Sequence, residues 1–255
     1  MTAARAYTPR HFPSGGPHRR HISAKPRKGG SIVLREDHGA VVDARTLFPS
    51  TRRHVEETKR ILKSGMNQRK LGRMVLKGRW RGFPIYALTL EERATCPSTC
   101  AMWRACYGNG MHMAERVVHD DEFEVVLRLE LESYQALHPG GFVVRLHVLG
   151  DFYSVDYVRL WQRALTNLPA LNVFGFTARE RSDPIGRELR KVAGRFGRRF
   201  AMRWSGESGP MGAVTVERGA ATPITVCPAQ QREDRFCGNC GLCWHSKAPV
   251  AFWRH

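Results

Sequence analysis

Short apolar runs alternate with amphipathic stretches from Phe83 to the end of the chain. The runs at 83–90, 142–150, 171–178 and 198–205 have the length and the aromatic and β-branched content of strands, and shorter ones follow at 212–216, 222–226 and 249–253. Helical periodicity marks residues 112–137, 154–168 and 183–196. We expect Ser154 and Asp183 to be N-caps, with Pro184 in the first helical turn.

This alternation predicts an α/β fold with a parallel sheet, arranged as a partial or complete (β/α) barrel. The pattern before Phe83 is weaker. It suggests a hairpin at 31–42 and two basic helices at 54–63 and 67–78, the first one capped by Ser50 or Thr51. We therefore expect a disordered basic arm at 1–30, a basic helical extension at 31–82, an α/β core at 83–210 and a C-terminal cysteine-rich segment at 211–255.

The formal net charge of +18 is concentrated ahead of the core. Residues 1–30 hold seven basic and no acidic residues, and residues 51–82 hold eleven basic and two acidic ones. A basic segment of this kind favours a polyanion, so nucleic acid is a candidate partner of residues 1–82. A solubilising tail and a solvated helix face would explain the same charge.

The chain contains seven cysteines, which are clustered rather than spread. No stretch offers the roughly 20 apolar residues of a membrane span, and the N-terminus has no apolar signal region. We expect a cytoplasmic protein with no membrane partner, whose thiols meet metals rather than each other.

The first cluster is Cys96, Cys100 and Cys106, in a loop between a predicted strand and a predicted helix. Three thiolates can hold three irons of a 4Fe–4S cluster and leave the fourth iron open to a small ligand. Zinc is the alternative metal. It would need a fourth ligand, for which His112 is the nearest candidate.

The second cluster is Cys227, Cys237, Cys240 and Cys243. Glycines inside this segment let the backbone curl around a bound group. Four thiolates make a closed site, which suits a structural or electron-transfer cluster, and zinc could be held by the same four residues.

Three predicted strands carry polar residues in alternating phase towards their ends. These are Arg145, His147 and Asp151, then Gly175, Thr177 and Arg179, and then Arg203, Ser205 and Glu207. Buried parallel strands are normally apolar, and ligands bind at their carboxyl ends, so one polar face lining a site is expected. Edge strands, or ion pairs inside a plain core, are the alternative explanation.

The segment 96–255 resembles a family of uncharacterised phage and plasmid proteins, the gene-product-eighty-eight family. The resemblance rests on the cysteine loop, the Arg-x-His-x-x-Gly-Asp-Phe segment at 145–152, the Phe-Thr pair at 176–177 and the Cys-Gly-x-Cys-x-x-Cys segment at 237–243. It implies little about function.

The chain has a more distant resemblance to radical S-adenosylmethionine enzymes. These enzymes place three cysteines after the first strand of a partial barrel and a Gly-rich acidic motif at the end of the second. Cys96, Cys100 and Cys106 match the first feature, and Gly150 with Asp151 match the second. The spacing differs from the usual C-x3-C-x2-C, because the second gap is five residues and the aromatic Tyr107 follows the last cysteine.

We therefore expect an iron–sulfur protein with one or two 4Fe–4S clusters, and an enzyme if the open iron binds S-adenosylmethionine and receives an electron from a donor. The residues expected to position the reacting ligand are Asp151, Thr177, Arg179, Arg203 and Glu207. Those expected to bind the cofactor are Gly150, Asp151, His147 and Arg145. The rival hypothesis is a zinc-stabilised nucleic-acid-binding protein without catalysis.

Overall fold

A seven-stranded, mostly parallel sheet forms the centre of the computed structural model, which describes residues 32–68 and 70–254. The strand order is β2-β3-β5-β6-β7-β8-β9, and β2 alone pairs antiparallel, at one edge. The strands are β2 (Lys63–Ser64), β3 (Ile85–Ala87), β5 (Phe142–Leu146), β6 (Leu171–Thr177), β7 (Phe200–Ser205), β8 (Gly212–Val216) and β9 (Val250–Trp253). This sheet confirms the predicted α/β class.

A separate two-stranded parallel pair joins β1 (Arg52–Arg53) to β4 (Arg116–Val117). The expected strand at 222–226 contributes a single bridge, between Val226 and Ala251. The arm expected at 1–30 lies outside the described residues.

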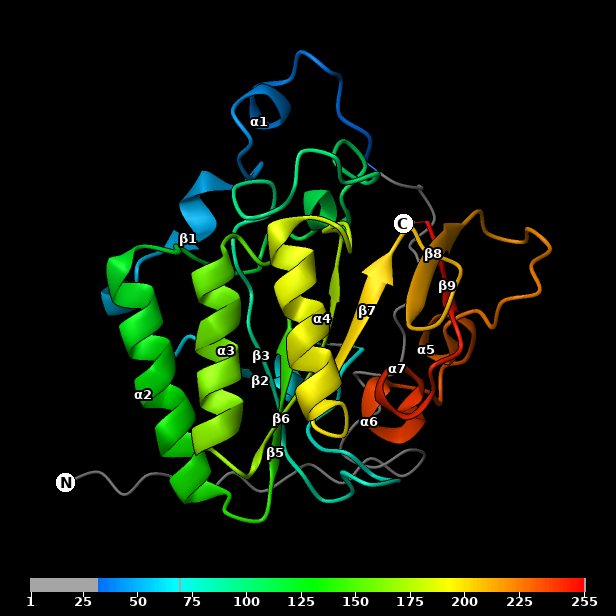
Figure 1. Cartoon of the computed structure of the whole chain (residues 1–255). Coiled ribbons are helices and arrows are strands. Elements are labelled where there is room, and N and C mark those ends of the chain that lie inside the picture. The colour runs from blue at the N-terminus through cyan, green and yellow to red at the C-terminus, as the bar shows by residue number, and fades with distance from the viewer. Residues whose placement is uncertain (1–31, 69, 255) are drawn as a thin grey trace.

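Three long helices lie side by side on one face of the sheet (Figure 1): α2 (Asp121–Leu137), α3 (Val155–Asn167) and α4 (Pro184–Phe196). The short helices are α1 (Gly39–Val42), α5 (Pro228–Gln231), α6 (Cys237–Cys240) and α7 (Leu242–His245), with 3-10 turns η2 (Pro49–Thr51), η3 (Val55–Glu57), η4 (Gly65–Asn67) and η5 (Tyr107–Gly110). Within the described residues, none of the helices is long and apolar enough to cross a bilayer.

The predicted caps of α3 and α4 are confirmed. Ser154 Oγ accepts from Tyr157 N at 3.0 Å, and Asp183 caps α4 in the same way. Helix α2 begins at Asp121 rather than at residue 112. Ahead of it, Arg116 and Val117 form β4 instead of a helical turn. The N–H groups of Val117 and Val118 donate to the carbonyls of Thr89 and Arg53, so they are not available for helical hydrogen bonds.

The two faces of the sheet carry different cores. The helix-side core includes Val144, Val173 and Trp161, packed between the sheet and α2 to α4. The second face carries Phe174 and Trp244, and this face is covered by the segment around Leu71 to Trp80 and by the C-terminal cysteine segment. It is the face on which the cysteines of the C-terminal segment lie.

The first of the two basic helices expected before residue 82 is absent. Residues 54–63 contain the 3-10 turn η3 and the start of β2 instead. The N–H groups of Ile61 and Leu62 donate to the carboxylate of Glu130 on α2 at 2.7 and 3.0 Å. This tertiary contact takes the place of helical hydrogen bonds.

The second expected helix, at 67–78, is also absent from the described residues. The chain from 73 to 85 folds back on itself, with Val75 N donating to Phe83 O at 2.9 Å. Further upstream, α1 replaces the hairpin expected at 31–42. Local helical periodicity was too weak in these segments to compete with pairing against the rest of the fold.

Residues 65–82 pack directly on the C-terminal cysteine segment. Cys237 N donates to Lys70 O at 2.7 Å, and the Trp80 and Trp244 rings stack with centroids 5.4 Å apart. The segment before β3 and the C-terminal cysteine segment are therefore packed together.

Replacing Glu130 with Ala should lower the free energy of unfolding by about 3 kcal/mol, because two buried N–H groups lose a charged acceptor. Urea denaturation measures this loss, and hydrogen exchange should accelerate at the Ile61 and Leu62 amides. Glu132→Ala, two residues further along α2 and exposed, is the control and should change stability by less than about 0.5 kcal/mol. Equal effects of the two variants would contradict the anchoring role.

Candidate metal-cysteine sites

The first cysteine site lies in the loop that follows β3. Cys96, Cys100 and Cys106 are free, half-buried thiols. Burial raises the pKa of each, that of Cys106 to about 11, and at Cys96 the charge of Asp151 adds to the rise, as do its two neighbouring thiols. Burial thus favours the neutral thiol at each of the three positions, and a bound cation such as a metal ion would favour the thiolates.

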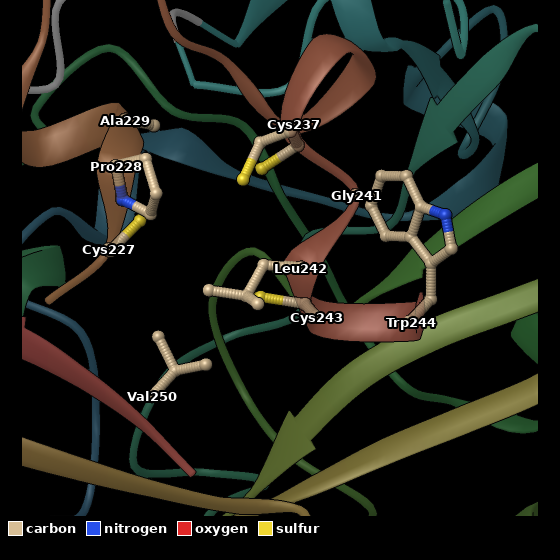
Figure 2. Close-up of a pocket in the computed structure, with 10 residues that line it drawn as sticks. Cys227, Pro228, Ala229, Cys237, Gly241, Leu242, Cys243, Trp244 and Val250 are labelled. Carbon is tan, nitrogen blue, oxygen red and sulfur yellow. The ribbon is translucent and has the colours of Figure 1, made fainter. Parts of the chain in front are cut away.

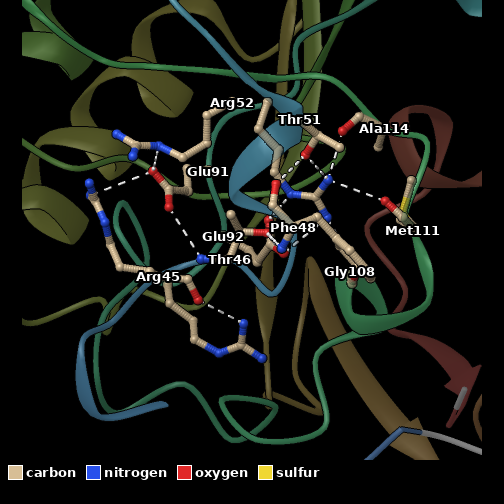
Figure 3. Close-up of polar contacts among 12 residues, drawn as sticks. Arg45, Thr46, Phe48, Thr51, Arg52, Glu91, Glu92, Gly108, Met111 and Ala114 are labelled. Atoms are coloured by element: carbon tan, nitrogen blue, oxygen red, sulfur yellow. Dashed lines mark hydrogen bonds and ion pairs between the residues drawn. The ribbon is translucent and has the colours of Figure 1, made fainter. Parts of the chain in front are cut away.

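A fully buried ion pair holds this loop (Figure 3). Arg116 Nε and Nη2 donate to the two carboxylate oxygens of Glu92 at 2.6 and 3.0 Å, and both side chains are at most 1 % exposed. The same guanidinium donates to Ala114 O at 2.6 Å, Gly108 O at 3.2 Å and Thr51 Oγ1 at 2.9 Å. Arg116 therefore fixes the chain on both sides of the third cysteine.

Glu91 and Arg93, on either side of Glu92, also hold the first cysteine loop. Glu91 pairs with Arg52 at 3.0 Å. Arg93 donates to Asn109 Oδ1 at 2.5 Å and to Trp103 O at 3.0 Å, so it spans the loop that contains Cys100 and Cys106. None of these charged residues was predicted from the sequence as part of a site. The available signal was a run of three charged residues directly after an apolar strand.

The carboxyl ends of β3, β5 and β6 meet beside this loop. Arg179 donates to Thr95 O at 2.9 Å and to Phe152 O at 2.8 Å. Asp151 accepts from the N–H groups of Phe152 and Ala178, each at 2.7 Å, and its own N–H donates to Thr95 Oγ1 at 3.1 Å. Two of the predicted site residues are thus brought together next to Cys96.

Thr177 and Gly150 join Asp151 and Arg179 in one group of contacting residues, which we call the Asp151 cluster. The Thr177 hydroxyl accepts from Arg179 N at 3.0 Å and also bonds to Asp151. Gly150 has φ of 82°, and a Cβ there would lie 2.5 Å from Thr95 Oγ1, so only glycine allows the strand end to approach the cysteine loop. Burial raises the pKa of Asp151 to about 6 against the opposing effect of its hydrogen bonds.

The second cysteine site is a pocket lined by all four C-terminal cysteines. Figure 2 shows Cys227, Cys237 and Cys243 around one gap, and Cys240 completes the set. The other lining residues are Pro228, Ala229, Gly241, Leu242, Trp244 and Val250. Burial raises the pKa of the Cys243 thiol to about 11 and that of Cys237 further still.

Glycines shape this segment as expected. Gly241 has φ of 70° and lies between the short helices α6 and α7, which carry the last three cysteines. A Cβ on Gly238 would lie 2.2 Å from Met74 O, so this residue lets the loop approach the 65–82 segment.

Arg203 of β7 clamps the same segment from the sheet side. Its side chain is buried, and it donates five hydrogen bonds of 2.7 to 3.2 Å to main-chain carbonyls, including Cys243 O and Ser246 O. A guanidinium has five N–H donors, so all of them are used. Arg203 holds the second cysteine loop and lies apart from the Asp151 cluster.

The expectation that the polar strand residues share one face is wrong. In the sheet Arg145 is in register with Phe174, and Arg203 with Phe176, which places both arginines on the second face. Thr177 is in register with Trp204, a member of the helix-side core. The alternation within each strand was visible in the sequence. The register between strands decides whether the polar residues of neighbouring strands lie on the same face of the sheet.

The hydrogen-bond and ion-pair partners of His147 and Glu207 lie outside the Asp151 cluster. Strand β5 ends before His147, whose Nε2 lies 3.0 Å from the Tyr157 hydroxyl on the helix side, and burial lowers its pKa to about 3. Glu207 is paired with Arg181 at 2.7 Å and is 36 % exposed.

Both donor sets consist of sulfur, which among metals favours zinc and iron–sulfur clusters. His112, the possible extra zinc ligand, is exposed, and its ring faces Phe48 edge-on. In the described part of the chain no group of three or more His, Cys, Asp or Glu side chains is arranged around a single ion. The four thiols that line one otherwise apolar pocket fit a metal–sulfur group by their chemistry.

Glu92→Gln should lower the free energy of unfolding by about 3–5 kcal/mol, because Arg116 then remains buried without its counter-charge. Thermal or urea denaturation measures the change, and Glu92→Gln with Arg116→Met should recover part of it. The control is Glu36→Gln, whose partner Arg104 is exposed and whose loss should cost at most about 1 kcal/mol. A Glu92→Gln variant as stable as this control would refute the supporting role of the pair.

Comparison with models of known protein families, with curated proteins and with solved structures finds no match for this chain. The motif resemblances therefore remain predictions, and function has to be inferred from the two cysteine sites themselves.

Proposed function

We propose that this chain is an iron–sulfur protein with two separate cysteine-ligated clusters. The observation that carries the proposal is the division of the seven thiols into a group of three at the strand ends and a group of four in one pocket. Such a protein belongs in the reducing cytoplasm, where its thiols stay available to iron.

The first site has three cysteines for a 4Fe–4S cluster, which leaves one iron for a ligand. When bound there, the cluster would supply one-electron reduction of that ligand. Cys96, Cys100 and Cys106 would hold it, and the Glu92–Arg116 pair keeps their loop in place. The four-cysteine site would carry a closed cluster that relays electrons from an external donor.

The finer architecture that we propose is a partial (β/α) barrel. The strand order from β3 to β9 follows the chain without reversal, and α2, α3 and α4 cover one face. A doubly wound sheet would reverse its order and carry helices on both faces. This arrangement supports the resemblance to radical S-adenosylmethionine enzymes, as does the position of Gly150 and Asp151 at the end of β5 beside the first cysteine loop.

In this proposal the Asp151 cluster positions a ligand at the first site. Both carboxylate oxygens of Asp151 already accept a backbone N–H, and the remaining lone pairs can accept from the amino group of S-adenosylmethionine. Thr177 and Arg179 orient Asp151 and the neighbouring loops.

Anaerobically purified protein should be brown and contain about eight irons and eight sulfides per chain. Replacing Cys96, Cys100 and Cys106 together with Ala should remove about half of both, and should abolish reductive cleavage of S-adenosylmethionine to 5′-deoxyadenosine. Ser98→Ala, an exposed change in the same loop, is the matched control and should retain both properties. A colourless protein with stoichiometric zinc would contradict the proposal.

A second candidate function, polyanion binding by a zinc-stabilised protein without catalysis, is favoured by one surface. The 73–85 hairpin exposes three basic side chains, Lys77, Arg79 and Arg81. Partial burial lowers the pKa of Arg79, and the charge of nearby Arg198 lowers it further. Among the described residues, no carboxylate forms an ion pair with these four side chains. Phosphates could neutralise this basic hairpin surface.

The variant Lys77→Gln, Arg81→Gln, Arg198→Gln tests this candidate and spares Arg79, which bonds to Trp244 O. If the surface binds duplex DNA, the slope of log affinity against log salt should become shallower by up to about 3. Gln substitutions at Arg128, Arg163 and Arg190, exposed on the helices, serve as control. Unchanged slopes in the first variant, or no binding by the wild type at low salt, would exclude this function.

A further inference from the structure

Arg145 is a charged residue in the middle of the parallel sheet. It lies on β5, in register with Ala87 of β3 and Phe174 of β6, on the face away from the helices. Parallel strands at such a position are normally apolar. We therefore expect a group of opposite charge to stabilise the guanidinium of Arg145.

Aromatic rings and a carbonyl surround the guanidinium. It lies 5.6 Å from the centroid of Phe174 and 4.6 Å from that of Phe176, and it donates to Leu146 O. No carboxylate of the described residues forms an ion pair with it. Ring faces and one carbonyl offset a buried positive charge only in part.

Thiols of the second site lie near this cation. The Phe174 ring beneath it packs against Trp244, 4.6 Å between centroids, and Trp244 directly follows Cys243. Cys237 and Cys243 both act electrostatically on Arg145. So does Tyr107, which directly follows Cys106 of the first site. Arg145 is therefore near the second cysteine site and is linked to the first through the residue that follows Cys106.

We propose that Arg145 is a counter-ion shared by both cysteine sites, a positioning residue that stabilises the negative charge of the two metal–thiolate groups and links their redox behaviour. This inference rests on the proposed function, since it requires a cluster in each site.

The charge balance favours this role. Four thiolates on a 4Fe–4S cluster leave a net negative group, and such charge is a main determinant of cluster potential. Two other cations, Lys70 and Arg203, act on the second site. All N–H donors of Arg203 bond to carbonyls. Arg145 differs from Lys70 and Arg203 because it also interacts with Tyr107, the residue that follows Cys106.

The test compares Arg145→Met, which removes the charge at similar volume, with Arg145→Lys, which keeps it. Potentials of both clusters are measured by redox titration monitored by electron paramagnetic resonance. Loss of the cation disfavours the more negative reduced state, so both potentials should fall. The ratio of reduced to oxidised cluster at a fixed potential should drop about tenfold, which corresponds to 59 mV for one electron.

Arg145→Lys and Arg190→Met, an exposed change on α4, should leave both potentials near the wild-type values. If Arg145→Met does not fold, Arg145→Gln replaces it. Full iron content with unchanged potentials would overturn the proposal, and a shift at one cluster alone would overturn the sharing. Wild-type protein without iron and sulfide would instead refute the proposed function itself.

Discussion

The carboxylate of Glu92 and the guanidinium of Arg116 are almost completely excluded from water, so neither can lose its partner without a large penalty. The loop with the first three cysteines contains little regular secondary structure that could hold it. Its shape is maintained by Arg116, which pairs with Glu92 before the three cysteines and donates to the carbonyls of Gly108 and Ala114 after Cys106. The position of three thiols thus depends on one buried charge pair.

The second cysteine segment is also held by a buried guanidinium, that of Arg203. Arg203 donates hydrogen bonds to five main-chain carbonyls. The 65–82 segment contributes backbone hydrogen bonds and the stacking of Trp80 on Trp244. Irregular backbone leaves carbonyls without helical or sheet partners, and a planar guanidinium can satisfy several of them at once. Both cysteine loops are thus tied to the rest of the fold by buried arginines, and these ties limit the rearrangement that binding a metal–sulfur group would require.

The two sites also have different surroundings. The first lies at the carboxyl ends of the strands, beside a carboxylate whose pKa is raised by burial, where parallel folds bind their ligands. The second has an apolar lining and several nearby cations. Under the proposed function, this contrast assigns chemistry to the first site and electron storage or structure to the second.

The division of the cysteines into three and four, the helix caps at Ser154 and Asp183, and the alternation of strands and helices all followed from the sequence, because each depends on neighbours within a few residues. Tertiary structure alone decided the strand register that separates Arg145 and Arg203 from Thr177. It also decided that Arg203 clamps a loop, that Glu92 pairs with Arg116, and that the basic segment packs on the C-terminal cysteines. These contacts join residues far apart in the chain, and no local pattern specifies which distant carbonyl or carboxylate a buried arginine will reach.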